Sequence, residues 1–210
     1  SKIHRSVAKG HQEFLAAGVS NIVAVKFEKM VMAGVGLICG SLALDMRRRN
    51  LVKEVIGYGR SEGNLKIAKK KGLIDSYFVR AADFPAGVDF LMIGTPVETI
   101  VPLTQTFLPK LEKGCIVSDV GSVKGEIVRG MEKILPKHIS FVAGHPIAGS
   151  EQWGAQAARQ NLFVRHRCVL TPTKKTDKKA LKKVAELWRQ VGADVEIMHP
   201  DIHDRVLGVI

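Results

Sequence analysis

The fold of this chain is decided by the stretch Met30-Val31-Met32-Ala33-Gly34-Val35-Gly36-Leu37-Ile38-Cys39-Gly40-Ser41. Its first four residues are apolar and predict a buried β-strand, and a helix is expected from about residue 37 to residue 49. The glycines between them permit a tight turn and a close approach of the backbone to a ligand. The N–H groups that open such a helix favour an anion such as pyrophosphate, so the stretch predicts a dinucleotide site. The residues expected to form it are Gly34, Gly36, Leu37, Ile38 and Gly40.

This turn departs from the usual dinucleotide fingerprint at one position. Cys39 stands where a third glycine normally lets the helix pack closely on the strand. Because cysteine is small, we expect a slight adjustment of the packing and a retained site. The alternative interpretation is a glycine-rich turn that binds no ligand.

Strands and helices alternate along the chain, which predicts an α/β fold. Ser61 is expected to cap the start of one helix, and Gly72 to follow its end. Crossovers of this length give a doubly wound, mostly parallel sheet whose strands are apolar on both faces. The expected strands are 30–33, 54–58, 77–79, 88–94, 115–117 and 139–143, and the expected helices are 37–49, 61–71, 98–108 and 123–135.

The same pattern predicts the domain boundaries. One domain should occupy residues 29–199, and a further helix should begin at Pro200 and run toward residue 210. Residues 1–28 are an N-terminal extension whose role the sequence does not indicate. The remaining expected elements are strands at 168–170 and 195–198, a helix at 177–191 between them, and a short helix at 12–17 and a short strand at 21–25 within the extension.

Length and composition are typical of one globular domain. The chain has 210 residues, of which 46% are hydrophobic and 25% charged. No apolar run reaches the ~18–20 residues needed to cross a bilayer, and the N-terminus lacks a signal-peptide pattern, so we expect no membrane partner. The three cysteines are widely spaced and odd in number. This argues against disulfides and a zinc site and favours the cytoplasm.

The net charge of +12 raises the question of nucleic acid. Much of the excess lies on the polar faces or ends of amphipathic helices, without interleaved aromatic residues. We interpret these runs as solvated helix faces and expect no nucleic-acid partner. The alternative, binding of nucleic acid, would show a strong dependence on salt. The runs are 47–49, 69–71, 174–175, 178–179 and 182–183.

The end of the second strand bears on the choice of cofactor. An acid that binds the ribose 2′-hydroxyl normally stands there, about 20 residues past the glycines. The sequence instead has Tyr58-Gly59-Arg60-Ser61, so the acid is missing and a cation follows. Because a guanidinium pairs well with phosphate oxygens, we expect Gly59, Arg60 and Ser61 to favour NADP over NAD. The alternative is an exposed Arg60 that takes no part in binding.

Two further strand ends carry small polar residues. Thr95 and Pro96 either line the nicotinamide end of the cofactor or form an ordinary helix start with Thr95 as its cap. The fifth strand is followed by Asp119-Val120-Gly121-Ser122-Val123-Lys124. Ser122 is either a cap or a hydrogen-bond partner of a substrate or of the imidazole described next. Lys124 is either a solvated first-turn residue or a partner of the local carboxylates.

The sixth strand is followed by His145-Pro146-Ile147-Ala148-Gly149-Ser150-Glu151. We interpret this stretch as a loop at the carboxyl end of a strand, where open α/β sheets bind ligands. It places an imidazole, a hydroxyl and a carboxylate within seven positions, and such polar groups are costly to bury unless they are paired. The stretch therefore predicts a site. A structural histidine at a strand end is the alternative.

Together these motifs resemble one family, the prephenate/arogenate dehydrogenases. The glycine-rich turn, the Thr95 motif and the two later motifs occur in the order and spacing of that family, followed by Asn161-Leu162-Phe163 and His203-Asp204. The resemblance runs from about Met30 to Ile210. It implies a Rossmann-like fold and the oxidative decarboxylation of prephenate or arogenate, to 4-hydroxyphenylpyruvate or tyrosine, with hydride transfer to NAD(P) in tyrosine biosynthesis.

The resemblance also implies roles for single residues. His145 matches the family's catalytic histidine, which accepts the substrate's hydroxyl proton as a neutral imidazole. Ser122 matches the serine that orients this imidazole and the substrate hydroxyl. Glu151 matches an acidic residue that gates or orders the pocket, and we place Ser150 and Lys124 on the substrate side with it. The substrate is a small molecule, and no metal is expected.

In complete family members a helical dimerisation domain follows the His203-Asp204 pair and supplies an arginine for a substrate carboxylate. The chain stops at Ile210. We therefore expect that domain to be missing, this fragment to be inactive by itself, and the full-length protein to be a homodimer. Two alternatives stay open. One is another Rossmann-type NAD(P)-dependent dehydrogenase, such as a β-hydroxyacid dehydrogenase with its catalytic lysine on a later helix, and the other is a domain that binds NAD(P) without turnover.

Overall fold

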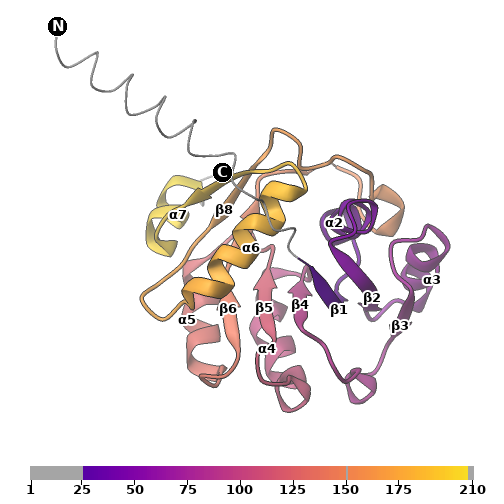
Figure 1. Ribbon diagram of the computed structural model, residues 1–210, viewed down its shortest axis with the longest axis horizontal. Coiled ribbons are helices and arrows are strands. Elements are labelled where there is room, and N and C mark those ends of the chain that lie inside the picture. Colours follow the sequence, from indigo (N-terminus) through magenta and orange to yellow (C-terminus); the bar gives the residue numbers. More distant parts are fainter. Residues whose placement is uncertain (1–25, 150, 208–210) are drawn as a thin grey trace, which may run out of the picture.

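The computed structural model describes residues 26–149 and 151–207, which form a central sheet with helices on both faces (Figure 1). The larger sheet has six parallel strands in the order β3-β2-β1-β4-β5-β6. The chain thus runs outward from β1 in both directions, which confirms the doubly wound α/β fold. The strands are β1 Phe27–Ala33, β2 Val52–Tyr58, β3 Ser76–Phe78, β4 Phe90–Ile93, β5 Ile116–Asp119 and β6 Ser140–Val142.

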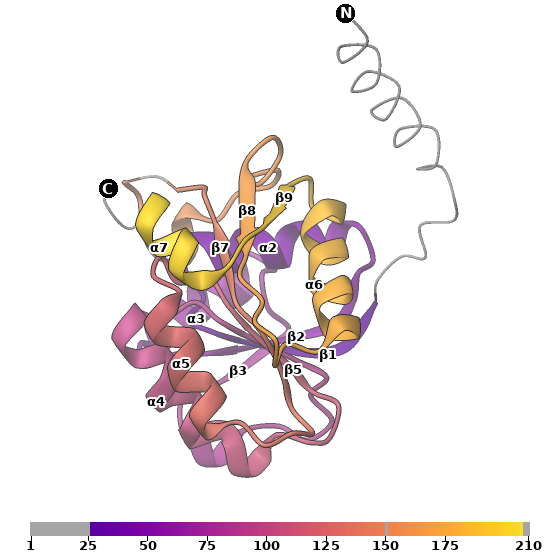
Figure 2. The same ribbon diagram turned by 90° about the vertical axis from the view of Figure 1, so that its left-hand side faces the viewer.

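The helices divide between the two faces of this sheet, as Figure 2 shows from the side. One face is covered by α2, α3 and α6, and the other by α4 and α5. The last helix, α7, lies against α5. The bounds are α2 Leu37–Arg48, α3 Glu62–Lys70, α4 Val97–Phe107, α5 Gly125–Ile134, α6 Lys178–Gln190 and α7 Pro200–Leu207, with short 3-10 turns η1 Ala81–Asp83, η2 Leu108–Lys110 and η3 Ala155–Ala157.

Burial on both faces explains the continuous apolar runs of the strands. In β1, Met30 and Met32 belong to the core under α2 and α6, whereas Val31 and Ala33 belong to the core under α4 and α5. All four side chains are fully buried. Alternation of side chains along a strand therefore sends every residue of this run into one of two cores, and no polar position remains.

The expected strands and helices of this domain are present, with ends that differ by a few residues. The strand expected from residue 30 begins at Phe27, whose ring stacks on Phe90 with centroids 4.4 Å apart. The Ser61 hydroxyl accepts a hydrogen bond from the Asn64 N–H at 3.4 Å, so the predicted cap is confirmed. Gly72 follows α3 with φ +70°, the left-handed conformation that ends many helices.

A second sheet corrects one prediction. The stretch that begins at His145 was expected to be a loop, but Gly144–Pro146 forms a short strand, β7. It pairs antiparallel with β8 (Arg167–Leu170), and β8 pairs parallel with β9 (Asp194–Ile197). Three residues with a proline among them carry no strand pattern of their own. The pairing depends on a partner more than 20 residues further along the chain, which local sequence does not reveal.

Between these strands the chain folds back over α2 and α3. The Asp45 carboxylate accepts hydrogen bonds from the Asn161 N–H at 3.1 Å, and Ser41 accepts one from the Arg159 N–H at 3.0 Å. Gly40 makes this possible, because a Cβ there would lie 2.7 Å from Cβ of Ala158. The segment therefore returns to the mouth of the glycine-rich turn.

Some expectations fall outside the described residues, namely the helix at 12–17, the strand at 21–25 and Ser150. Across the part that is described, no helix combines the length and apolarity that crossing a membrane requires. The expected solvated lysines are exposed at 174, 175, 178, 179 and 182.

Candidate active site

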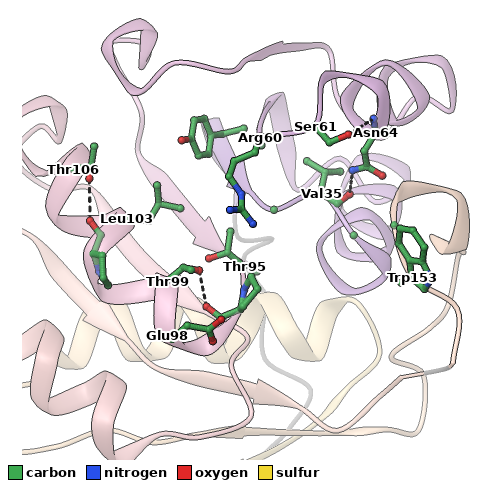
Figure 3. A pocket seen from close by; sticks show the side chains of 18 residues that line it. Val35, Arg60, Ser61, Asn64, Thr95, Glu98, Thr99, Leu103, Thr106 and Trp153 are labelled. Carbon is green, nitrogen blue, oxygen red and sulfur yellow. Dashed lines mark hydrogen bonds between the residues drawn. The ribbon is translucent and has the colours of Figure 1, made fainter.

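A cleft of about 970 Å³ opens at the carboxyl ends of β1, β2 and β4 (Figure 3). Seven of the expected cofactor residues line it: Gly34, Gly36, Gly59, Arg60, Ser61, Thr95 and Pro96. Leu37, Ile38 and Gly40 do not line it. Leu37 and Ile38 instead lie in the first turn of α2. The N–H groups of this turn have no carbonyl partner within the helix.

The glycine-rich turn has the geometry that a pyrophosphate requires. Gly34 has φ +88°, and a Cβ there would lie 2.6 Å from the carbonyl oxygen of Gly94. Gly36 precedes α2, and its Cβ position has nothing within 4 Å. The first glycine therefore allows the turn and the close packing of β1 on β4, while the second leaves the helix N-terminus open to a ligand.

Gly94 accommodates the cysteine that replaces the third fingerprint glycine. A Cβ on Gly94 would overlap Sγ of Cys39, which is buried. The cysteine thus occupies space at the end of β4 that any larger residue at position 94 would fill. Burial raises the pKa of the Cys39 thiol to about 12.

Arg60 and Ser61 lie at the end of β2 and face the cleft. Figure 3 shows the Arg60 side chain extending toward the middle of the cleft. No described residue forms an ion pair or hydrogen bond with its guanidinium. The Ser61 oxygen accepts the Asn64 N–H, and its own O–H remains able to donate. This is the donor set that a 2′-phosphate would need.

Thr95 supplies an independent sign that the cleft holds a ligand. Its Oγ1 atom is buried and has no hydrogen-bond partner among the described residues. The alternative in which Thr95 caps α4 is wrong, because Pro96 occupies the cap position and no side chain caps the helix. An unpartnered buried hydroxyl is costly. Together with the open glycine-rich turn, it fits a dinucleotide with polar atoms at this depth.

Two residues of the cleft were missed in the sequence. Asn64 donates to the carbonyl of Val35 at 2.8 Å and accepts the Ala155 N–H at 2.8 Å, so it ties the returning segment to the glycine-rich turn. Trp153 stands on that segment with 88% of its surface exposed, across the cleft from Leu103 (Figure 3). Both residues follow closely on predicted site motifs, Asn64 after Ser61 and Trp153 after Glu151, and this nearness was the signal that could have found them.

The second part of the site lies at the same edge of the sheet. A Cβ on Gly94 would lie 3.3 Å from Cγ2 of Val120, so the ends of β4 and β5 are neighbours. Asp119, the last residue of β5, accepts the Gly144 N–H at 3.3 Å. His145 is the next residue. The ends of β4, β5 and β7 are therefore neighbours at this edge of the sheet, and His145 is the middle residue of β7.

Lys124 and Asp119 form a buried ion pair beneath His145. Both side chains are fully buried, and the ammonium also donates to the Gly144 carbonyl at 2.7 Å. The solvated alternative for Lys124 is wrong, and its pairing with a local carboxylate is confirmed. Burial lowers the pKa of Lys124, although the charge of Asp119 acts in the opposite direction.

Ser122 is exposed, and no described residue hydrogen-bonds its hydroxyl. It does not cap α5, because that helix begins at Gly125 and its cap position is Lys124. The N–H groups of Lys124 and Gly125 are instead bound by Asp204, which accepts both at 2.8 Å. A carboxylate 80 residues away thus replaces the local cap.

His145 forms a hydrogen-bonded network with two residues of α7. Its Nδ1 atom lies 2.9 Å from Nε2 of His203, and Nδ1 of His203 lies 2.8 Å from Oδ1 of Asp204. His203 is fully buried. The sequence marked His203-Asp204 only through the family resemblance, since no local signal connects α7 with β7. We refer to these residues as the His145–His203–Asp204 network.

The surroundings of His145 keep its imidazole neutral. Burial, followed by the positive charge of Lys124 and the neighbouring His203, lowers the pKa of His145 from 6.5 to about 4, and Asp204 opposes this shift. Partial burial alone would raise the pKa of Asp204, but hydrogen bonds from Lys124, His203 and Gly125 hold it below its usual value. A neutral imidazole can accept a proton near physiological pH.

The structure places only some of the residues predicted on the substrate side. His145 borders a shallow pocket of about 330 Å³ with residues 146–149 and His166. Glu151 is exposed and lines none of the described pockets. Ser150 lies outside the described residues. Within the described part of the chain, no group of three or more His, Cys, Asp or Glu side chains could hold a metal ion.

Comparison with known families identifies the domain type. The family described as "Prephenate dehydrogenase, nucleotide-binding domain" matches residues 42–197. Prephenate dehydrogenase of Bacillus subtilis is 37% identical over 187 residues, which cover 87% of this chain and 50% of that protein. Cyclohexadienyl dehydrogenase of Zymomonas mobilis is 30% identical, and the match covers 87% of this chain and 62% of that protein. The chain thus spans about half to three fifths of these curated relatives.

Solved structures agree with these matches. Prephenate dehydrogenase from Aquifex aeolicus, in complex with hydroxyphenyl propionate and NAD+, superimposes with a TM-score of 0.82 and 38% identity, over 88% of this chain and 64% of that one. Synechocystis arogenate dehydrogenase gives a TM-score of 0.78 and 31% identity, over 85% of this chain and 62% of that one.

Proposed function

Because the chain belongs to the prephenate dehydrogenase family, we propose that its protein oxidatively decarboxylates prephenate or arogenate with hydride transfer to NAD(P). The products would be 4-hydroxyphenylpyruvate or tyrosine, which places the enzyme in tyrosine biosynthesis. The observation that supports this most strongly is His145 beside the end of β5, in surroundings that lower its pKa to about 4. A base beside a cofactor cleft is the minimum that the reaction requires.

The residues divide the chemistry between the two parts of the site. The first turn of α2 would hold the pyrophosphate, and Thr95 would donate or accept near the nicotinamide end. When bound, the nicotinamide would accept hydride from the hydroxyl-bearing ring carbon while carbon dioxide leaves and the ring becomes aromatic. His145 would take the proton of that hydroxyl, which pushes electron density toward the carbon that loses hydride. No metal is needed for this step.

Other substrate-side roles are part of the proposal. Ser122, exposed next to this edge, would bond the substrate hydroxyl or the imidazole once the substrate orders it. Glu151 and Ser150 would close the pocket beside His145. Lys124 would act through its charge, because its ammonium is already bound by Asp119 and the Gly144 carbonyl. These contributions are positioning and electrostatic.

The test is an assay of the full-length protein with each substrate and each cofactor. We expect reduced nicotinamide to appear only when prephenate or arogenate is present. His145→Asn should abolish turnover while cofactor affinity survives, because this residue does not line the dinucleotide cleft. A protein that binds NAD(P) but turns over neither substrate would refute the proposed reaction and favour a non-catalytic nucleotide-binding role.

We further propose that NADP is preferred to NAD. The support is the absence of an acid at the end of β2, together with the Ser61 hydroxyl and the Arg60 guanidinium, which no residue in the described part of the chain pairs. Arg60→Ala should weaken NADP binding by about tenfold or more and leave NAD binding nearly unchanged, since each tenfold step is about 1.4 kcal/mol. Titration of both cofactors measures this. If NAD binds more tightly than NADP and Arg60→Ala does not change its affinity, the proposed preference is wrong.

The proposal extends to the setting of the enzyme. All three cysteines are free and buried, which supports a cytoplasmic location. We propose that the full-length protein is a homodimer with a small-molecule substrate and without a nucleic-acid partner. Light scattering of the full-length protein, and a binding titration with duplex DNA at low salt, test the two parts of this statement.

A further inference from the structure

We propose that His203 and Asp204 fix the tautomer of His145, so that Nε2 of His145 is the atom that accepts the substrate proton. This inference rests on the proposed function, because it specifies how the proposed base is prepared. Two residues of α7 thereby become positioning residues for the reaction. Neither needs to touch substrate or cofactor.

The tautomer follows from the order of donors and acceptors in the His145–His203–Asp204 network. The ionised carboxylate of Asp204 can only accept, so the proton of neutral His203 must be on Nδ1, 2.8 Å away. Nε2 of His203 then carries a lone pair and can only accept. The atom 2.9 Å from it, Nδ1 of His145, must therefore donate its hydrogen. Nε2 of His145 is left with the lone pair.

The network is anchored at its far end. Both oxygens of Asp204 receive backbone N–H groups, those of Lys124 and Gly125, at 2.8 Å. The start of α5 thus holds the carboxylate in the orientation that His203 requires, and its positive end favours the ionised form. Because His203 is fully buried, water cannot replace either of its partners. The arrangement leaves little freedom for the opposite tautomer.

The charges around His145 are consistent with this assignment. The groups that act on it are the Lys124 ammonium, the neighbouring His203 and the Asp204 carboxylate. The Lys124 ammonium disfavours a positive charge on the imidazole of His145, so this ring enters the hydrogen bond as a neutral group. If His203 were protonated, its Nε2 would donate to His145, and the catalytic lone pair would face His203 instead of the substrate.

The first test reads the tautomer directly. The full-length protein is labelled with 15N-histidine, and the imidazole nitrogen shifts are recorded without substrate at neutral pH. The signals of His145 are those missing in His145→Asn. We expect a protonated Nδ1 and an unprotonated Nε2. A protonated Nε2 on His145 would overturn the inference, and this readout does not depend on turnover.

The second test compares two substitutions of His203. His203→Gln can present its amide oxygen to Nδ1 of His145, whereas His203→Leu has a similar volume and no acceptor. We expect kcat to fall by about 100-fold or more in His203→Leu and by less than about tenfold in His203→Gln, with cofactor affinity unchanged in both. The leucine variant should also show His145 as a mixture of tautomers.

The outcomes separate this inference from the proposed function. Equal kcat values for the leucine and glutamine variants, with wild-type cofactor affinity, would contradict the positioning role. An inactive wild type with Nε2 of His145 unprotonated would instead refute the reaction and leave the tautomer assignment standing. If His203→Leu fails to fold, the wild-type spectrum together with the kcat of His203→Gln still decides the matter.

Discussion

Lys124 and Asp119 form an ion pair in which both side chains are completely buried, at the junction of β5, β7 and the start of α5. Its lysine donates to the carbonyl of Gly144, the residue before His145, and contributes to the lowering of the His145 pKa. Asp119 also accepts N–H groups of Gly121 and Gly144. The same ion pair therefore holds the ends of β5 and β7 together and influences the pKa of His145.

Removal of one partner of this ion pair should strongly lower the free energy of unfolding. Lys124→Met leaves the Asp119 carboxylate buried without its cation, which typically costs about 3–5 kcal/mol. Adding Asp119→Asn should recover part of this loss, because the charge is removed and one amide oxygen still accepts. The free energy of unfolding, measured with urea, gives these values.

A matched control exists on the surface. Lys53 and Glu28 form an ion pair at 3.3 Å whose side chains are 79% and 75% exposed. Lys53→Met should cost less than about 1 kcal/mol, as exposed pairs do. Equal costs for Lys124→Met and Lys53→Met would mean that the buried pair contributes no more than a solvated one.

Gly94→Ala should destabilise the protein through its overlap with Cys39. Forced overpacking of a close-packed core typically costs about 1–3 kcal/mol. In a Cys39→Ala background the same substitution should cost less, because the overlapping sulfur is gone, with a coupling of about 1 kcal/mol. Urea denaturation of the four proteins of this cycle measures the coupling. Strictly additive costs would show that the two residues do not compete for space.

Gly36→Ala should separate ligand binding from stability. The Cβ position of Gly36 is open and its φ of −108° suits alanine, so the free energy of unfolding should change by less than about 1 kcal/mol. Cofactor affinity should fall by about tenfold or more, because the methyl group would occupy the approach to the pyrophosphate. Gly72→Ala provides the opposite pattern. Its φ of +70° makes alanine cost about 1–2 kcal/mol, and it lies outside the cleft.

The pH dependence of turnover should follow His145. In the free protein its pKa is about 4, so kcat/KM should fall below this pH and be flat above about pH 5 with respect to this group. An anionic substrate bound beside the imidazole would favour its protonated form. The apparent pKa in the kcat profile should therefore be higher than that in kcat/KM. Identical values would argue against a nearby substrate carboxylate.

Stability should respond to the same group. The unfolded chain binds a proton on this histidine near pH 6.5, whereas the folded protein does so only near pH 4. Stability is therefore fully present above pH 6.5 and falls as the pH is lowered toward 4. The lowered carboxyl pKa values act only at and below their ordinary range, so the contribution of His145 is measured between pH 6.5 and 5, as the difference from His145→Asn. Urea midpoints should fall less steeply in His145→Asn.

Local signals carried much of the fold and part of the site. Each of these signals depends only on residues that are neighbours in the sequence. They are the apolar runs of β1 and β4, the glycine-rich turn and the Ser61 cap. β7 was not predictable in this way, because its three residues pair with β8 across a long intervening segment. Asn64 and Trp153 were likewise missed, since only the fold brings the segment after Glu151 back to the glycine-rich turn.

The sequence by itself determined the doubly wound sheet, the glycine-rich turn and the position of His145 after the sixth strand. Periodicity, turn residues and strand-end motifs are local properties, which can be recognised in the sequence without knowing how the elements pack. Only the tertiary structure decided the partners of that histidine and of Lys124. Hydrogen bonds and ion pairs depend on distances between atoms, and residues 58 positions apart, such as His145 and His203, become neighbours only when α7 packs against α5 and β7.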